Sequence, residues 1–299
     1  MVVKNIMSDI IKIKKSQKSR LCAITAMFLL LIITAYLITD QYLIVNPEYT
    51  IESKSINNKF NIAVITDLHS MNFGGDNQVV VDIIQKQSPD MIAVVGDIVD
   101  EYNSDITNAL NIMTKLPQIA PTYYVVGNHD YKCERYLEFR YEIRESGVTI
   151  LENEISYIDI NENKIAILGL ISYSSGEYEE KEYINLMKEF CENSYYKILL
   201  CHYPEFTNWF FEQDKYYEYD FDLMLSGHTH GGLINLPLFG GLYAPNQGFL
   251  PKYSKGMYYI DEGNKNPYYM IISGGLGQDR RFFRINNFPE VVSVTVNPE

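Results

Sequence analysis

The sequence predicts an α/β domain preceded by one membrane-spanning helix near the N-terminus. The domain is predicted because short apolar segments of strand length alternate with amphipathic segments from Phe60 onward. The helix is predicted because residues 21–39 carry no charged side chain and follow a lysine-rich segment. No internal repeat or low-complexity run interrupts the 299 residues, so we expect one folded domain.

The N-terminal segment is strongly basic, unlike the rest of the chain. Residues 1–20 carry six basic side chains and one acidic one, whereas the remainder has a net charge of −18. The uncharged segment 21–39 approaches the ~20 residues that a membrane-spanning helix needs. A cleavable signal peptide has a shorter apolar region, about 7–15 residues, that ends in small residues at a cleavage site, and this segment has no such site. Because basic flanks stay cytoplasmic, we expect a cytoplasmic head at 1–20, a single-pass anchor in the cell membrane at 21–39, and an extracytoplasmic domain.

The remaining bulk properties limit the function classes. Residues 40–59 are expected to form a polar tether, and residues 60–299 the folded domain. The acidic domain repels nucleic acid, so we expect no nucleic-acid binding. The four cysteines contain no Cys-x-x-Cys pair, which indicates neither a disulfide framework nor a thiolate zinc site.

Strands are predicted where apolar runs are short, and helices where apolar residues recur at helical spacing. The expected strands are 60–66, 91–96, 122–127, 164–170, 197–201, 222–227, 268–273 and 290–296. The expected helices lie around 77–87, 104–115, 131–146 and 181–192.

Five of these strands end directly before residues of metal-binding type. In α/β sheets, ligands bind outside the carboxyl ends of the strands, where loops from rigid strands converge. All five histidines of the protein belong to this set, whereas incidental histidines would also occur in helices or in the tether. The residues are Asp67, His69, Asp97, Asn128, His129, His202, His228 and His230.

The spacing within each motif indicates how the side chains can cooperate. Asp67 and His69 are two residues apart, so in an extended segment both can face one metal ion, and His228 and His230 repeat this spacing. Asp97 supplies a carboxylate with two oxygens, which can bridge two cations. Mixed aspartate, asparagine and histidine ligands without cysteine favour Mn, Fe or Zn over copper.

The motif Gly-Asn-His-Asp contributes three further candidates. Asn128 offers a neutral oxygen ligand, and His129 beside it points elsewhere, so it is free to act on a substrate. Asp130 is expected to hold the His129 imidazole in the correct tautomer, as carboxylates do for catalytic histidines. His129 and Asp130 are therefore the candidate catalytic residues.

In order, the blocks Asp-x-His, Gly-Asp-x-x-Asp, Gly-Asn-His-Asp, a lone His and Gly-His-Thr-His resemble the calcineurin-like metallophosphoesterase superfamily. The C-terminal part resembles its membrane-associated or exported bacterial branch in "GHTHGGLINLPLFGGLYAPNQ", "KGMYY", "SGGLG" and "RINNFPEVVSVTV". The resemblance covers residues 60–296. It implies a two-sheet β-sandwich flanked by helices and a binuclear centre of two divalent metal ions.

The resemblance also implies a role for each matching residue. Metal one would take Asp67, His69, Asp97 and His230, and metal two would take Asp97, Asn128, His202 and His228. A bridging water or hydroxide would be the nucleophile, and His129 would stabilise the phosphoryl group or protonate the leaving oxygen. Gly274 departs from the pattern, since relatives of this branch have an arginine there; the basic cluster Arg280, Arg281 and Arg284 is a candidate replacement, the alternative being a solvated surface loop.

These observations predict a binuclear metallophosphoesterase, a phosphoric ester hydrolase that cleaves a phosphomonoester or phosphodiester at the outer membrane face. The alternative is a catalytically silent scaffold or interaction protein, which should have lost a ligand or His129, and no motif position is substituted. A serine hydrolase is rejected because no Gly-x-Ser-x-Gly motif occurs. The apolar stretch 233–251 is either a packed loop or an apolar lip beside the site, and the second interpretation predicts a lipid-linked or cell-envelope substrate.

Overall fold

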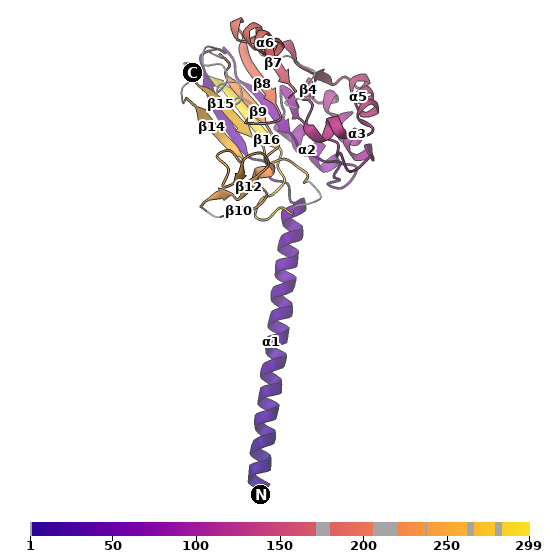
Figure 1. Cartoon of the computed structure of the whole chain (residues 1–299), viewed down its shortest axis with the longest axis vertical. Helices are drawn as coiled ribbons and strands as arrows, with labels where there is room; N and C mark the ends of the chain where they lie inside the picture. The colour runs from indigo at the N-terminus through magenta and orange to yellow at the C-terminus, as the bar shows by residue number, and fades with distance from the viewer. Residues whose placement is uncertain (1, 172–179, 206–219, 237, 262–265, 279–282) are drawn as a thin grey trace.

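A long N-terminal helix projects from a mixed α/β domain (Figure 1). The structure, a computed structural model, describes residues 2–171, 180–205, 220–236, 238–261, 266–278 and 283–299. Helix α1 (Val2–Tyr42) includes the apolar segment expected from the sequence. Within the described residues, Gln17–Tyr42 is the one helical segment long and apolar enough to cross a membrane, and none of its most apolar part is buried by the domain.

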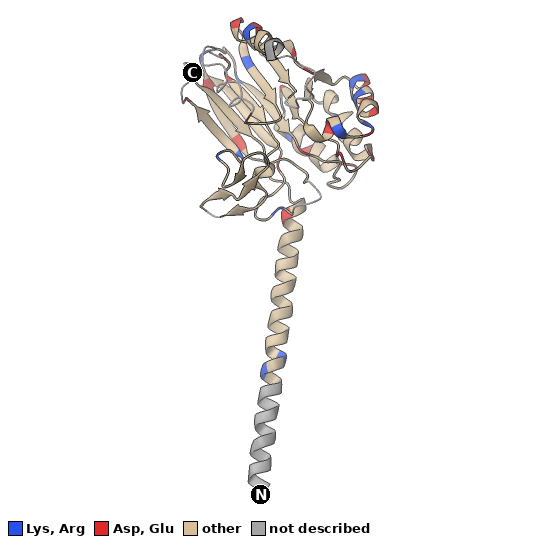
Figure 2. Cartoon of the chain, in the orientation of Figure 1, with Lys and Arg blue, Asp and Glu red and all other residues tan. Residues whose placement is uncertain are grey.

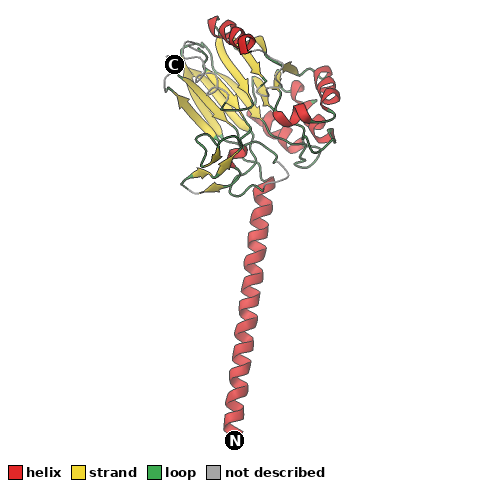
Figure 3. Ribbon diagram, viewed as in Figure 1, coloured by secondary structure: helices red, strands yellow, loops and turns green. Residues whose placement is uncertain are grey.

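The strands of the described residues form two six-stranded sheets and two short hairpins (Figure 3). The first sheet has the order β1-β16-β2-β3-β4-β5, parallel except where β16 meets β2. Its strands are β1 (Glu48–Ser53), β16 (Val292–Pro298), β2 (Phe60–Ile65), β3 (Met91–Val95), β4 (Thr122–Val125) and β5 (Thr149–Leu151). The parallel run β2-β3-β4 places three carboxyl ends at one edge of this sheet.

The second sheet has the order β14-β15-β9-β8-β7-β6, with antiparallel pairs at both edges and parallel strands between. Its strands are β14 (Gly256–Ile260), β15 (Tyr268–Ile272), β9 (Leu223–Ser226), β8 (Tyr196–Cys201), β7 (Asn163–Leu170) and β6 (Glu154–Ile160). The two sheets pack face to face, because apolar residues of both meet in one buried cluster that includes Val64, Val95 and Leu200. This confirms the two-sheet sandwich.

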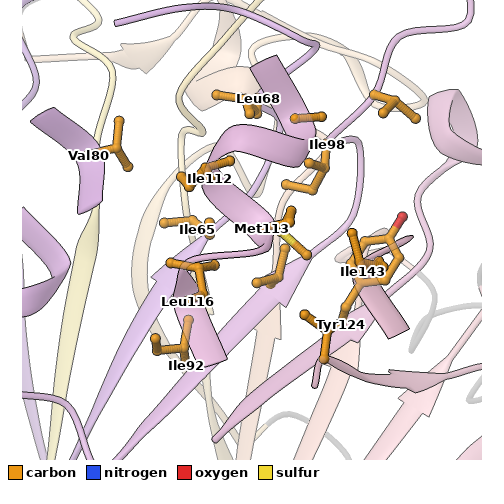
Figure 4. Packing of buried hydrophobic residues seen from close by; sticks show 14 of the residues in the cluster. Ile65, Leu68, Val80, Ile92, Ile98, Ile112, Met113, Leu116, Tyr124 and Ile143 are labelled. Atoms are coloured by element: carbon orange, nitrogen blue, oxygen red, sulfur yellow. The ribbon is translucent and has the colours of Figure 1, made fainter. Parts of the chain in front are cut away.

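Helices cover the outer face of each sheet. Against the first sheet pack α2 (Gln78–Gln87), α3 (Thr107–Met113) and α5 (Tyr136–Glu145), and against the second packs α6 (Glu180–Glu192). Figure 4 shows Ile112 and Met113 of α3 beside Ile65 of β2, all fully buried. The short helices are α4 (Asn128–Lys132) and the 3₁₀ turns Leu116–Gln118 and His230–Gly232. The eight expected strands and three of the four expected helices are present, with ends that differ by a few residues. The helix expected at 131–146 is divided into α4 and α5, because the backbone of Cys133 is extended.

Two small hairpins lie at the end of the domain where α1 joins it (Figure 1). The first pairs β10 (Asn235–Leu236) with β11 (Gly240–Gly241), and the second pairs β12 (Tyr243–Ala244) with β13 (Gly248–Phe249). Both belong to the apolar stretch that follows the last two histidines.

The segment expected as a tether, residues 40–59, is largely built into the fold. Its residues 48–53 form β1, which pairs in parallel with β16 along its whole length. The N–H of Val45 also donates to the carbonyl of Pro289 at 2.9 Å. The sequence did not reveal this strand, because β1 lies at a sheet edge and of its six residues only Ile51 is buried.

The C-terminal end of α1 is bonded to the domain. Asp40 and Gln41 are buried, although the helix before them is exposed. The Gln41 Nε2 donates to the carbonyl of Arg284 at 2.7 Å, and the backbone N–H of Asn287 donates to Asp40 Oδ1 at 3.1 Å. The helix therefore continues into the domain without a free linker.

Candidate metal centre

The expected site residues lie together at one edge of the sandwich. Asp67 and His69 follow β2, Asp97 follows β3, and Asn128 begins α4 directly after β4. From the second sheet, His202 follows β8, and His228 and His230 follow β9. Backbone bonds join these loops, since the N–H groups of Asp67 and His69 donate to the carbonyls of Gly96 and Asp97. Both sheets thus contribute side chains to one buried centre.

Two carboxylates lie in the middle of this centre. Asp67 Oδ1 is 3.6 Å from His230 Nε2 and 3.9 Å from the Nε2 atoms of His69 and His202. Asp97 Oδ2 is 3.1 Å from His202 Nε2 and 3.9 Å from His69 Nε2. Their other oxygens already accept hydrogen bonds: Asp67 Oδ2 from the backbone N–H of His228, and Asp97 Oδ1 from that of His129. Each carboxylate is thus fixed by one oxygen and offers the other to the centre.

Buried polar atoms without a hydrogen-bond partner are concentrated in this centre. Among the described residues, eight of the 17 such atoms belong to the site residues: Asp67 Oδ1, His69 Nδ1 and Nε2, Asp97 Oδ2, Asn128 Oδ1, His129 Nδ1, His202 Nε2 and His230 Nδ1. Native proteins contain only a few such atoms per hundred residues, because each costs the desolvation free energy of the group. Eight in one place indicate that the centre is built for a cationic partner.

Neighbouring groups determine which imidazole nitrogen faces the centre. His202 Nδ1 lies 2.7 Å from the carbonyl oxygen of Val95. Because a carbonyl oxygen can only accept a hydrogen bond, Nδ1 carries the proton, and Nε2 is left as a ligand atom. The Nε2 of His228 lies 3.1 Å from the side-chain amide of Asn246, so His228 would bind a cation through Nδ1. Asn246 was not predicted from the sequence, because it comes from the second hairpin.

Five of the expected ligands have a left-handed backbone. The φ angles are +51° at Asp67, +48° at His69, +55° at Asp97, +69° at His228 and +48° at His230. This region is uncommon for residues other than glycine and costs on the order of 1–3 kcal/mol per residue. Such a concentration of strained residues at the ends of three strands is typical of a functional site.

A glycine beside these loops allows the close packing. A Cβ atom at Gly227 would lie 2.2 Å from Thr66 Oγ1 and 2.6 Å from Asp67 Oδ2. The backbone that carries His228 can therefore approach the first ligand loop only because residue 227 has no side chain.

Burial keeps most of the imidazoles neutral. It lowers the pKa of His69 to about 4 and holds the pKa values of His228 and His230 well below the ordinary value. Burial also raises the pKa of Asp67 to about 6. Neutral imidazoles are the form that binds a metal ion, so these histidines are prepared for ligation.

His202 and Asp97 form a tightly coupled pair. Burial alone would lower the pKa of His202, but the negative charge of Asp97 raises it to about 10. Burial alone would raise the pKa of Asp97, but His202 beside it holds it well below the ordinary value. A cation bound here would replace the imidazolium proton of His202 as the positive charge beside the Asp97 carboxylate.

His129 has a different carboxylate partner from the one expected. Its Nδ1 lies 3.4 Å from Asp100 Oδ1, and its ring packs edge-on against His69 with centroids 4.6 Å apart. Burial would lower the pKa of His129, but Asp100, Asp97 and Glu101 together raise it. Asp100 is the last residue of the block Gly-Asp-x-x-Asp and was not among the predicted site residues.

Asp130 instead holds the loop that follows β3. Its carboxylate oxygens accept the backbone N–H groups of Asp97, Ile98, Val99 and Gly127 at 2.7–2.9 Å. The expected contact between Asp130 and the His129 ring is not formed, because successive side chains of a helix point about 100° apart. Asp130 thus positions Asp97 rather than His129.

Arg284 is buried behind the centre, not solvated on a surface loop. It is 1% exposed, its Nη2 donates to the carbonyl of Gly274 at 2.7 Å, and its Nε donates to that of Gly277 at 3.1 Å. It therefore occupies the neighbourhood of Gly274, where an arginine was expected. Arg280 and Arg281 lie outside the described residues.

Asn287 links the end of α1 to the centre. Its Nδ2 donates to the carbonyl of His230 at 2.6 Å, while its backbone N–H donates to Asp40. The sequence contains no motif that would identify Asn287, since its importance follows only from the contact.

The described side chains form three groups that could hold a metal ion. They are Asp67, His69 and His230; His69, Asp97 and His129; and Asp97, His202 and His228. In each group the donor atoms lie within 4.8 Å of one another. The donors are nitrogen and carboxylate oxygen, the set that suits borderline divalent cations.

A sequence profile of calcineurin-like phosphoesterases matches residues 60–232. The chain belongs to the calcineurin-like phosphoesterase family. Members of this family are phosphoesterases that typically bind two divalent metal ions, and the groups above lie in the matched segment.

Relatives of this chain occur in bacteria. The uncharacterized metallophosphoesterase YkoQ of Bacillus subtilis is 30% identical over 237 residues, which cover 78% of this chain and 82% of YkoQ. The phosphodiesterase YaeI of Escherichia coli is 26% identical over 192 residues, 62% of this chain and 66% of YaeI. Among solved structures, TT1561 of Thermus thermophilus is similar with a TM-score of 0.45 at 14% identity, covering 73% of this chain and 90% of that chain.

Proposed function

We propose that the protein hydrolyses a phosphoester with two divalent cations bound at the candidate centre. Asp67, His69, Asp97 and His230 would hold one cation, and Asp97, Asn128, His202 and His228 the other. Two of the three observed donor groups are subsets of these two sets. The carboxylate of Asp97 faces both sets, since its Oδ2 lies near His69 and His202.

The observation that carries this proposal is the group of eight buried polar atoms without partners. They come from five strand ends in two sheets, so no local sequence preference accounts for their meeting. Left uncompensated, each would cost about 1–3 kcal/mol. Within the described part of the chain, only three of the eight have a charged neighbour within 3.4 Å: His202 Nε2 and Asp97 Oδ2 face each other, and His129 Nδ1 faces Asp100. Bound cations would compensate them, and Mn, Fe or Zn matches the mixed nitrogen and oxygen donors.

Bound cations would supply Lewis acidity toward the phosphoryl oxygens and lower the pKa of the attacking water. The chain's own residues position the other participants. His129 lies against the ligand His69, and Asp100 lies beside its Nδ1, which leaves Nε2 to contact the leaving oxygen or the phosphoryl group. Asp130 holds the backbone around Asp97 and so fixes the carboxylate shared by both sets.

The proposal includes a location at the cell membrane. Residues 21–39 would cross the membrane once, with the basic head in the cytoplasm and the catalytic domain outside. Figure 2 shows basic residues below this segment, an acidic residue above it and no charged residue between. In the sequence that acidic residue is Asp40. A phosphoester linked to a lipid or to the cell envelope is the substrate class that this location favours.

The test uses the full chain purified in detergent. Metal content is measured after loading with Mn²⁺, Fe²⁺ or Zn²⁺, and chromogenic phosphomonoesters and phosphodiesters are assayed with the wild type and His129→Asn. We expect close to two equivalents of metal in both proteins and hydrolysis only in the wild type. Absence of bound metal, or equal hydrolysis by both proteins, would contradict the proposal. Metal binding without hydrolysis of any ester would instead support the silent scaffold.

A further inference from the structure

Large apolar side chains are exposed on three loops near the end of α1. We define the apolar face as Leu238, Phe239, Phe249, Leu250 and Phe283. Their exposed fractions range from 65% to 101%. Single exposed apolar residues are normal on a soluble surface, but a contiguous group marks an interaction site.

Backbone hydrogen bonds hold these loops against one another. Asn235 N–H donates to the carbonyl of Ile285 at 2.9 Å, which joins the first hairpin to the segment that carries Phe283. Leu242 N–H donates to the carbonyl of Ile234 at 2.8 Å, and Leu250 N–H donates to the carbonyl of Leu242 at 2.8 Å, which joins the second hairpin to the first. The apolar face is therefore one surface.

The composition of the two hairpins favours an apolar partner. Residues 231–250 contain no charged side chain, in a chain of which 21% is charged. In Figure 2 the hairpins carry neither basic nor acidic residues, unlike the helices on the far side of the domain. A surface without charge fits an apolar environment, not an acidic or basic protein partner.

The apolar face continues into the exposed surface of α1. A groove of about 430 Å³ lies between them, lined by Leu37, Ile38 and Tyr42 of α1 and by Phe283 and Ile285 of the domain. The apolar residues of α1 that precede it, from Leu21 to Ile38, are themselves exposed. Whatever covers the helix thus also reaches the groove and the adjoining loops.

We propose that the apolar face and the groove insert into the outer boundary of the same bilayer that α1 crosses. This inference rests on the proposed membrane anchor. Hydrogen bonds hold the end of the helix against the loops, since Gln41 is bonded to Arg284, the neighbour of Phe283. A bilayer that surrounds α1 up to Thr39 therefore meets the loops at its surface.

Insertion places the metal centre beside the lipid headgroups. Asn246, in the turn of the second hairpin, contacts the Nε2 of His228, and His230 lies five residues before β10. The substrate class that this arrangement fits is a phosphoester in the headgroup region of an amphiphile. Such a substrate reaches the centre without leaving the membrane.

The test measures the depth of single tryptophans in the full chain. The native Trp209 is replaced by phenylalanine, and Phe239→Trp, Phe249→Trp or Phe283→Trp is introduced singly. The proteins are placed in nanodiscs of phosphatidylcholine and phosphatidylglycerol with or without bromine at the top of the acyl chains. We expect bromine to reduce emission about twofold, because interfacial side chains lie roughly 5–10 Å into the headgroup boundary.

The matched control is Leu137→Trp on α5. Leu137 is 77% exposed, like the residues of the apolar face, but lies away from α1 (Figure 1). Its emission should not depend on bromine. Equal emission with and without bromine at all three test positions would overturn the proposal. A dimer in detergent would also overturn the proposal if the double substitution Phe239→Ser and Phe249→Ser dissociated that dimer. The apolar face would then be the contact with a second copy of the chain.

An activity measurement separates this proposal from the proposed function. Leu238→Ser with Phe239→Ser should raise the KM for a phosphoester presented in vesicles and leave the KM for a soluble chromogenic ester unchanged; Leu137→Ser should change neither. An equal change in both KM values would count against membrane insertion. Bromine quenching in a protein that hydrolyses no ester would sustain the insertion and refute the proposed function alone.

Discussion

At the metal centre, buried nitrogen and oxygen atoms lack hydrogen-bond partners, whereas on the apolar face large apolar side chains lack a covering surface. The two regions are adjacent in the chain, since residues 228–230 lead directly into the two hairpins. Each region is unfavourable in water when alone, but for opposite reasons. The polar atoms of the centre have lost their hydration without gaining hydrogen bonds, whereas the apolar side chains of the apolar face stay in contact with water. The two proposals account for this difference with two separate partners, a cation for the centre and a lipid surface for the apolar face.

The two regions also differ in how they are held. The ligands lie at the ends of central strands and are fixed by backbone bonds between loops, whereas the apolar face lies on two-residue strands. Substitutions should therefore separate them: changes at the centre alter chemistry and metal affinity, and changes on the apolar face alter membrane contact.

The largest effect is expected for His129→Asn. Removal of a general acid or transition-state donor lowers kcat about 10²–10⁴-fold. Metal content should stay that of the wild type, because His129 is outside both proposed ligand sets. Steady-state kinetics and metal analysis of the same preparation test this, with Tyr131→Phe as a control that should retain activity. A parallel loss of metal would show that His129 is a ligand.

Metal loading should stabilise the protein without involving the apolar face. At a free metal concentration of 100 times the Kd, a ligand bound only by the native state adds about 2.7 kcal/mol to the free energy of unfolding. Leu238→Ser with Phe239→Ser should show the same gain. Thermal unfolding in detergent with and without chelator measures it. A gain abolished by the apolar-face substitutions would show that the two regions are not independent.

Asp40→Ala is expected to weaken metal binding from a distance. It removes the acceptor of the Asn287 backbone N–H, and Asn287 in turn donates to the carbonyl of His230. Loss of such a supporting partner costs about 10–100-fold in metal affinity. Titration with Mn²⁺ measures the change. The control is Asp76→Ala, an exposed carboxylate on a loop, which should bind metal like the wild type.

The smallest effect is expected at a polar pair that already has its partners. Arg140 donates to Glu152 from Nε at 3.0 Å, and Tyr136 donates to the same carboxylate. Burial would raise the pKa of Glu152, but these donors lower it. The contribution to stability is thus present above the ordinary pKa of 4.5 and is lost as pH falls through the lower folded value.

Glu152→Gln should therefore cost no more than about 1 kcal/mol at neutral pH, because the pair is partly exposed. The difference from the wild type should shrink in acid, as measured by denaturant unfolding between pH 3 and pH 7, a range of ~4 units around that pKa. A difference that grows in acid would contradict the assignment.

The sequence was sufficient for the central strands and for the residues at their ends. Strands such as β3 and β8 are buried on both faces and appear as uninterrupted apolar runs, so their ends are visible in the sequence. The edge strands β1 and β6 were not predicted, since half-exposed polar residues there obscure the pattern. Contacts between distant segments, such as Asp100 with His129 or Arg284 with Gly274, have no sequence signal because they depend on the packing of loops.

The bonded end of α1 has a kinetic consequence. Because Asp40 and Gln41 are buried in the domain and residues 48–53 belong to its sheet, no flexible segment allows the active site to swing away from the helix axis. With the proposed membrane anchor, the enzyme would search for substrate by lateral diffusion in two dimensions. Its rate should follow the surface density of the phosphoester in the bilayer, so dilution with inert lipid should slow hydrolysis even at constant bulk concentration.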